Sequence, residues 1–163
     1  MRTAVLMVGN IRTWDHRKDN FNLVFGKLNP DIFITTYNRQ YAYHPYISQS
    51  LNFYEDYDLD NQTIQSMFSG LNVKNIVIDD IDSYVDVKVK PFISPKFPRD
   101  AFLSLSQYFK LHDGMKKILE EEQASGFQYD CIIKTRFDIT YNDFNINIGD
   151  ENVYVDGSGA GVF

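Results

Sequence analysis

Residues 129–138 read YDCIIKTRFD. The centre of this stretch, residues 130–134, is a continuous apolar run, which is typical of a strand covered on both faces in a parallel sheet. The residues that follow, from Thr135 to Asp138, would then lie at the carboxyl end of that strand. Open α/β sheets bind their ligands at this edge, so the stretch predicts both the type of sheet and the place of its site.

Three more short apolar runs precede this one, at residues 3–8, 31–36 and 75–78 (TAVLMV, DIFITT and NIVI). They are also continuous rather than alternating, and we predict that they are strands of the same sheet. Three helices are predicted between the strands: residues 19–28, 61–68 with Asn61 as N-cap, and 100–123 with Asp100 as N-cap. This alternation predicts an α/β fold in which helices flank a mostly parallel central sheet.

Other segments depart from this pattern. Residues 41–57 are rich in Tyr, Asn, Ser and Asp, and residues 82–98 contain three prolines, so we expect long loops at both. Residues 153–155 (VYV) have the character of a further strand and precede a glycine-rich run. Such a run usually leads into another element, so we expect the domain to be incomplete at its C-terminal end.

The composition is that of a globular protein with one domain, with 44% hydrophobic and 23% charged residues among 163. A formal net charge of −6 argues against binding to nucleic acids or anionic membranes, which requires a basic face. The single cysteine, Cys131, cannot form an internal disulfide, and no apolar run approaches the length of a membrane span. We therefore expect a cytoplasmic protein without a membrane span.

Polar residues follow each of the first three predicted strands. Gly9 lets the backbone approach a ligand closely, and Arg12 offers a forked donor suited to a diphosphate. Tyr37 either stacks on a base or a sugar or packs at the sheet edge. The third strand is followed by three carboxylates that form either a solvated turn or part of a metal site: Asp79, Asp80 and Asp82. No GxGxxG or P-loop motif follows any strand, which argues against nicotinamide enzymes and P-loop kinases.

Arg136 and Asp138 follow the fourth strand and point to one face, because they are two residues apart, while Phe137 points to the other face. They form either a structural ion pair or a site for a metal–diphosphate, with Asp138 on the cation and Arg136 on the phosphate oxygens. Transfer of a sugar from a nucleotide donor needs the second arrangement. A divalent cation and an arginine stabilise the charge that develops on the leaving nucleoside diphosphate.

Four motifs, in this order and spacing, resemble those of nucleotide-sugar glycosyltransferases of GT-A fold. They are G-x-x-R at residues 9–12, D-hydrophobic-T-Y at 31–37, SQYFKL at 106–111 and YD-hydrophobic-K-T-R-x-D at 129–138. Such enzymes occur in surface-polysaccharide gene sets and in large DNA viruses that glycosylate their own capsids. The chain resembles in particular the N-terminal domains of algal-virus capsid glycosyltransferases. The resemblance covers nearly the whole chain and implies a Rossmann-like GT-A fold.

The resemblance also implies roles for individual residues. In similar enzymes the loop after the first strand holds the nucleoside and the SQYFKL helix faces the donor. The nucleotide-sugar-binding residues would be Val8, Gly9, Asn10, Arg12, Tyr37, Gln107, Lys110 and Arg136. Lys110 is otherwise a surface residue of its helix. The catalytic pair would be Arg136 and Asp138, with Asp138 on Mn²⁺ or Mg²⁺. Only the second carboxylate of the family's D-x-D motif is present, and the alternative metal ligands are Asp79, Asp80 and Asp82.

The implied activity is that of a metal-dependent hexosyltransferase, which moves a sugar from a UDP-sugar such as UDP-glucose to a glycan or glycoprotein acceptor. For a viral chain the location would be the host cytoplasm. Relatives continue into an acceptor-side region, so acceptor recognition and any catalytic base would lie outside these residues. Two other readings stay open from the residues themselves: a non-catalytic nucleotide- or glycan-binding module, and a structural α/β domain.

Overall fold

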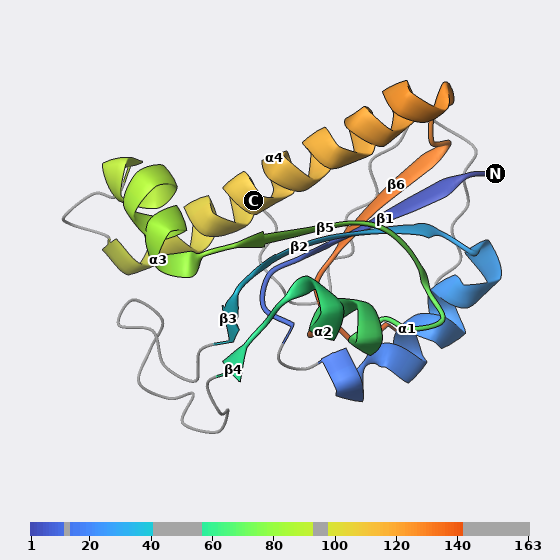
Figure 1. Ribbon diagram of the computed structural model, residues 1–163, viewed down its shortest axis with the longest axis horizontal. Helices are drawn as coiled ribbons and strands as arrows, with labels where there is room; N and C mark the ends of the chain where they lie inside the picture. The colour runs from blue at the N-terminus through green and yellow to red at the C-terminus, as the bar shows by residue number, and fades with distance from the viewer. Residues whose placement is uncertain (12–13, 41–56, 93–97, 142–163) are drawn as a thin grey trace.

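The structure is a computed structural model that describes residues 1–11, 14–40, 57–92 and 98–141 (Figure 1). Its centre is a four-stranded sheet in the order β5-β2-β1-β6, with every pair of neighbours parallel. The predicted α/β class and the four predicted strands are confirmed. They are β1 (Thr3–Val8), β2 (Asp31–Tyr37), β5 (Asn72–Asp79) and β6 (Cys131–Thr135).

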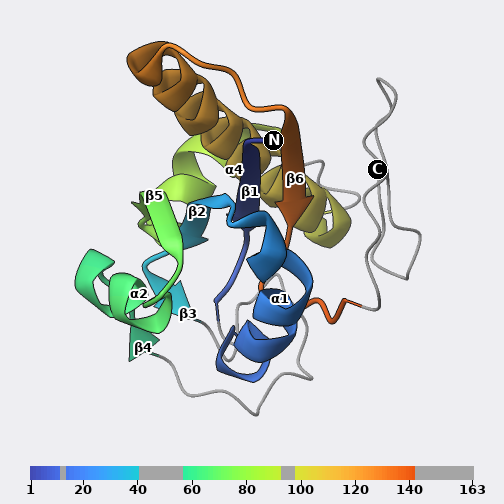
Figure 2. The same cartoon turned by 90° about the vertical axis from the view of Figure 1, so that its right-hand side faces the viewer.

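Helices cover both faces of this sheet (Figures 1 and 2). On one face lie α1 (Lys18–Phe25), which continues into the 3-10 turn η2 (Gly26–Leu28), and α2 (Asn61–Met67). On the other face lies α4 (Pro98–Ser125). Among the residues that the structure describes, no helix is both long and apolar enough to cross a bilayer.

The central strand β1 separates two hydrophobic cores. None of its six side chains is more than 3% exposed. Val5 and Met7 pack in the core that includes residues of α1 and α2, whereas Leu6 and Val8 pack in the core that includes Ile118 of α4. A continuous apolar run is required here because successive side chains of a strand point to opposite faces and both faces are covered.

The chain reverses its direction of winding at β1. The strands β1, β2 and β5 follow one another outward, and α4 then leads back over the opposite face to β6 on the other side of β1. This order is compatible with a Rossmann-like sheet. A reversal of this kind leaves a crevice at the carboxyl ends of the two strands that flank it, here β1 and β6.

The structure corrects two predicted helix starts. The N-cap of α2 is Asp60, whose carboxylate accepts a hydrogen bond from the Thr63 N–H at 2.7 Å, and Asn61 is the first helical residue. An aspartate suits this position because the helix N-terminus favours a negative charge. α4 begins at Pro98 instead of near Asp100, since the first helical position tolerates the missing N–H of proline.

The prediction of a loop over residues 82–98 is wrong where the structure describes this segment. Three short helical turns follow β5: α3 (Ile81–Tyr84), the π-helical η3 (Val85–Val89) and the 3-10 turn η4 (Lys90–Phe92). Ile81, Tyr84 and Val89 are buried, so hydrophobic burial orders a segment whose apolar spacing fits no regular helix.

A small antiparallel pair, β3 (Arg39–Gln40) and β4 (Tyr57–Asp58), stands at the ends of the other predicted loop. Tyr57, which the prediction included in that loop, is therefore in a strand. Residues 41–56 and the predicted strand at residues 153–155 lie outside the described residues.

α4 approaches β1 closely at Gly114. Between residues 105 and 125 of α4, where burial is described, the buried residues recur every four positions and form one stripe toward the sheet: Ser106, Lys110, Gly114 and Ile118. A Cβ atom at Gly114 would lie 2.4 Å from Cδ1 of Leu6, and Leu6 is fully buried. Because cores are close-packed, α4 can pass this close to Leu6 only where the helix carries no side chain.

We predict that Gly114→Ala lowers the free energy of unfolding by up to about 2 kcal/mol. The added methyl group overpacks the core at a cost of about 1–3 kcal/mol, and the gain of about 1 kcal/mol that alanine brings to a helix offsets part of this cost. Urea unfolding measures it. In a Leu6→Ala background the cost should disappear, so a double-mutant cycle with purely additive terms would contradict this reading.

Candidate functional site

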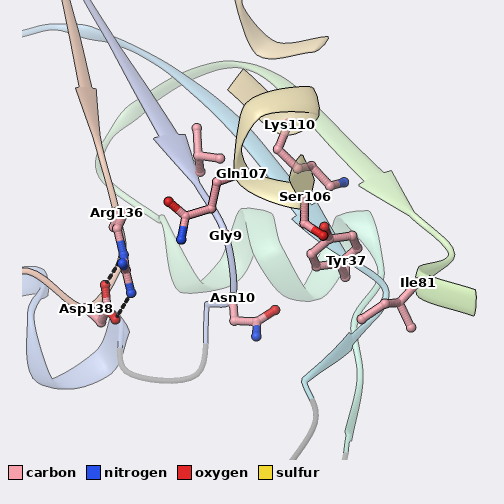
Figure 3. A pocket seen from close by; sticks show the side chains of 10 residues that line it. Gly9, Asn10, Tyr37, Ile81, Ser106, Gln107, Lys110, Arg136 and Asp138 are labelled. Atoms are coloured by element: carbon pink, nitrogen blue, oxygen red, sulfur yellow. Dashed lines mark hydrogen bonds and ion pairs between the residues drawn. The ribbon is translucent and has the colours of Figure 1, made fainter. Parts of the chain in front are cut away.

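A pocket lies at the carboxyl edge of the sheet, where β1, β2 and β6 end and the N-terminal half of α4 passes over them (Figure 3). This is the crevice expected beside the point where the winding reverses. Most of its lining consists of residues singled out in the sequence: Val8, Gly9, Asn10, Tyr37, Gln107, Lys110, Arg136 and Asp138. Ile81 and Ser106 also line it.

Gly9 shapes the floor of the pocket. Its φ of +116° lies in the region that favours glycine, and its N–H donates to the carbonyl of Thr35 at 3.1 Å. A Cβ atom here would meet no atom within 4 Å from the part of the chain that the structure describes. The residue is therefore required by its backbone conformation, and the open space above it lets a ligand reach the main chain.

Asn10, next to Gly9, adds a polar group. Its Oδ1 atom is buried, and no hydrogen-bond partner for it lies among the residues that the structure describes. A buried acceptor of this kind usually has a partner, so a donor on a ligand would fit here. Gln107 from α4 lines the same pocket and is exposed. Arg12, predicted to bind a diphosphate, lies outside the described residues.

Arg136 and Asp138 form a forked ion pair at one end of the pocket (Figure 3). The guanidinium donates from Nε to Oδ1 at 2.8 Å and from Nη2 to Oδ2 at 2.5 Å. Each side chain is about a third exposed, so an anion from solution can compete for the guanidinium. Phe137 points away and is buried between Trp14 and Phe68, which agrees with the predicted division of faces.

No known protein family, curated protein or solved structure matches this chain.

The turn that carries Asp138 is tied to α1 by a residue that the sequence analysis missed. Asn20 donates from Nδ2 to the carbonyl of Tyr141 at 2.9 Å and accepts from the Tyr141 N–H at 2.7 Å. The Tyr141 ring packs against Phe25, and its hydroxyl contacts that of Thr135. No local sequence signal marks Asn20, because its partner is 121 positions away.

Lys110 lines the pocket but is not a surface residue, because its side chain is only 1% exposed. Its ammonium donates to the carbonyl of Thr36 at 2.6 Å and to the carboxylate of Asp79. The rings of Tyr37 and Tyr84 lie 4.3 Å and 4.7 Å from the nitrogen. Burial lowers the pKa of Lys110 to about 8, although Asp79 opposes the shift.

Two of the three carboxylates considered as alternative metal ligands, Asp79 and Asp80, have other partners. Asp79 pairs with Lys110. Asp80 accepts from the Ser83 N–H and from the Asn38 side-chain amide, both at 2.9 Å, at the start of α3. The side chain of Asp82 is outside the described set. Within that set, no three His, Cys, Asp or Glu side chains gather as a metal site would require.

Ser106 and Ile81 are the pocket residues that the sequence did not indicate. Ser106 stands one helical turn before Lys110, and its side chain lies beside that of Tyr37 (Figure 3). Burial raises the pKa of the Tyr37 hydroxyl, which therefore stays neutral at ordinary pH. Ser106 is part of the SQYFKL motif. Its spacing of four residues from Lys110 places both on the same face of the helix, and this spacing could have indicated that Ser106 lines the pocket.

We predict that Asn20→Ala lowers the free energy of unfolding by about 1–3 kcal/mol, because it leaves both main-chain groups of Tyr141 without their partner. Urea unfolding measures the loss. Asn22→Ala, an exposed position of the same helix, is the matched control and should change stability little. Equal effects at the two positions would contradict the proposed tie.

The buried ammonium of Lys110 predicts a pH dependence of stability. Its folded pKa is about 8, below the ordinary 10.5. Between these values the unfolded chain holds a proton that the folded chain has lost, so the free energy of unfolding rises with pH. Wild type should therefore gain stability relative to Lys110→Met between about pH 8 and 10 in urea unfolding. A difference that stays constant over this range would contradict the assignment.

Proposed function

We propose that this chain binds a nucleotide-sugar in the pocket and forms the donor-binding part of a GT-A glycosyltransferase. The transferred sugar would come from a UDP-sugar and go to a glycan or protein acceptor. One observation carries the proposal: a forked cation and an open glycine turn meet at the carboxyl ends of β1 and β6. This is the position at which open α/β sheets bind nucleotides.

The pocket residues divide the tasks of donor binding. Arg136 offers a planar fork that matches a phosphate, and its partly exposed pair with Asp138 is weak enough for a diphosphate to displace. Gly9 admits the ligand to the main chain, and Asn10 has a buried acceptor for a donor group. Tyr37 provides an aromatic wall for the base or the sugar.

Arg136 would also favour the reaction itself. When the bond between the sugar and the nucleoside diphosphate breaks, negative charge develops on the leaving phosphate. A guanidinium already at that end of the pocket stabilises this charge. The preference for UDP and the choice of a glycan or glycoprotein as acceptor both rest on the motif resemblance.

The expected Mn²⁺ or Mg²⁺ does not fit the described residues alone. Among the described residues that line the pocket, Asp138 is the only carboxylate, and both its oxygens are engaged by Arg136. A divalent cation held by the protein needs several oxygen ligands. The proposed binding of the diphosphate therefore rests on Arg136, and the comparison of Mn²⁺ with EDTA below tests metal dependence.

A second candidate is a nucleotide- or glycan-binding module without turnover. One observation favours it: no pocket-lining carboxylate in the described part of the chain is free to act as a general base, since Asp138 is paired. A structural α/β domain, the third possibility, would use the Arg136–Asp138 pair for stability alone.

We expect UDP-sugars to raise the melting temperature of the chain, and GDP- and CMP-sugars to do so less. A ligand at 100 times its dissociation constant stabilises by about 2.7 kcal/mol, which corresponds to about 5–10 °C in a domain of this size. Each sugar is tested with Mn²⁺ and with EDTA. A shift that needs Mn²⁺ assigns the metal to the site. A shift that survives EDTA indicates that arginine binds the diphosphate without a metal. No shift on a folded sample would overturn the proposal.

Arg136→Ala should weaken UDP-sugar binding about 10–100-fold without unfolding the chain, because it removes charged hydrogen bonds to the phosphates. Isothermal titration calorimetry measures the affinity. Lys117→Ala, which breaks an exposed pair with Glu120 at 2.6 Å on α4, is the control and should leave the affinity unchanged. If Arg136→Ala and Asp138→Asn lower the melting temperature but not the affinity, the pair is structural.

A further inference from the structure

Lys110 is a cation that the fold encloses at the wall of the pocket. It stands on α4 in the buried stripe that faces the sheet, with 1% of its side chain exposed. Its own carbonyl accepts a hydrogen bond from the Thr35 hydroxyl at 3.3 Å. Main chain and side chain of Lys110 therefore both bind the end of β2.

The ammonium joins three elements at the carboxyl edge of the sheet. It bonds to the carbonyl of Thr36 in β2 and to the carboxylate of Asp79 in β5. It also lies over the rings of Tyr37 and Tyr84, within the range of cation–π attraction. The donors of the ammonium are thus directed at the protein, and a phosphate would have to displace Asp79 to reach it.

Such a cation is a poor means of stabilising a fold. Its pKa is lowered by burial despite the adjacent carboxylate, which means that removing this charge from water costs more than its partners return. Apolar side chains in place of both Lys110 and Asp79 would fill the same space at lower cost. We therefore look for a role of the ammonium other than stability, and its contacts indicate that it fixes the geometry of the groups around it.

We propose that Lys110 is a positioning residue of the pocket, which holds Tyr37 and the ends of β2 and β5 in place and does not contact the ligand. This inference rests on the proposed function only for the identity of the ligand. It replaces the expectation that Lys110 contacts a phosphate or a sugar directly.

The two ends of the pocket then have different roles. Figure 3 shows Arg136 and Asp138 at one end, Tyr37 and Ile81 at the other, and Asn10 between them. An anionic group is recognised at the Arg136 end, since the Lys110 ammonium is held by Asp79. An uncharged ring of the ligand lies against Tyr37, whose position depends on Lys110.

The test compares two probes: UDP, whose diphosphate and ring would reach both ends of the pocket, and inorganic pyrophosphate, which has no ring and would occupy only the Arg136 end. Both are titrated calorimetrically into the full chain. Lys110→Met should weaken UDP binding about tenfold, the size of one aromatic stacking contact, and should leave pyrophosphate binding within about twofold. Arg136→Ala should weaken both probes. An equal loss of both probes in Lys110→Met, or a loss of neither, would overturn the proposal.

Two further variants serve as controls. Lys110→Met leaves the Asp79 carboxylate without its partner, so the double variant Lys110→Met/Asp79→Asn removes both charges and guards against misfolding. It should show the same selective loss of UDP. Lys18→Met is the matched control, because Lys18 also bonds to main-chain carbonyls, those of Met67 and Ser69, but outside the pocket lining. It should bind both probes as wild type does.

A readout without ligand separates this inference from the proposed function. If wild type binds neither probe, the proposed function fails, and the position of Tyr37 is then followed by the NMR signals of its ring. These signals should shift in Lys110→Met and in the double variant but not in Lys18→Met. Unchanged Tyr37 signals in both Lys110 variants would show that the ammonium does not position this ring.

Discussion

The burial of β1 on both faces is the constraint on which the rest of the structure depends. A strand with no exposed face needs a partner strand on each edge and a helical layer over each side. β2 and β6 provide the partners, α1 and α2 cover one face, and α4 covers the other. Because α4 must pass over the opposite face to reach β6, the winding reverses beside β1, and the pocket opens where that strand ends.

Two basic side chains that line the pocket, Arg136 and Lys110, differ in what surrounds them, and this difference determines what each can do. Arg136 is about a third exposed and pairs with a carboxylate that is equally exposed, so water screens the pair and a ligand anion can replace Asp138. Lys110 is enclosed among Asp79, Thr36 and two tyrosine rings. Its ammonium bonds to groups of the protein and not to a ligand, and in this way it orders the wall of the pocket.

The Arg136–Asp138 turn gains its position from contacts outside the pocket. Phe137 is inserted in the aromatic core beside Trp14, and Asn20 closes a pair of hydrogen bonds with Tyr141. The turn is thus held by the burial of the Phe137 ring and by the Asn20 side chain, which both donates to and accepts from the main chain of Tyr141. A rigid support of this kind is what a site needs if its charges are to meet a phosphate in one geometry.

The sequence alone determined the four strands, the main helices and the strand-end residues that line the pocket, because continuous apolar runs and helical spacing are local signals of burial. Tertiary structure decided the rest. The partners of Lys110, the clamp of Asn20 on Tyr141 and the helical turns after β5 depend on contacts between residues 25 to 121 positions apart. Sequence spacing carries no signal for such contacts, since the free energy of each comes from groups that meet only once the sheet and its two helical layers have formed.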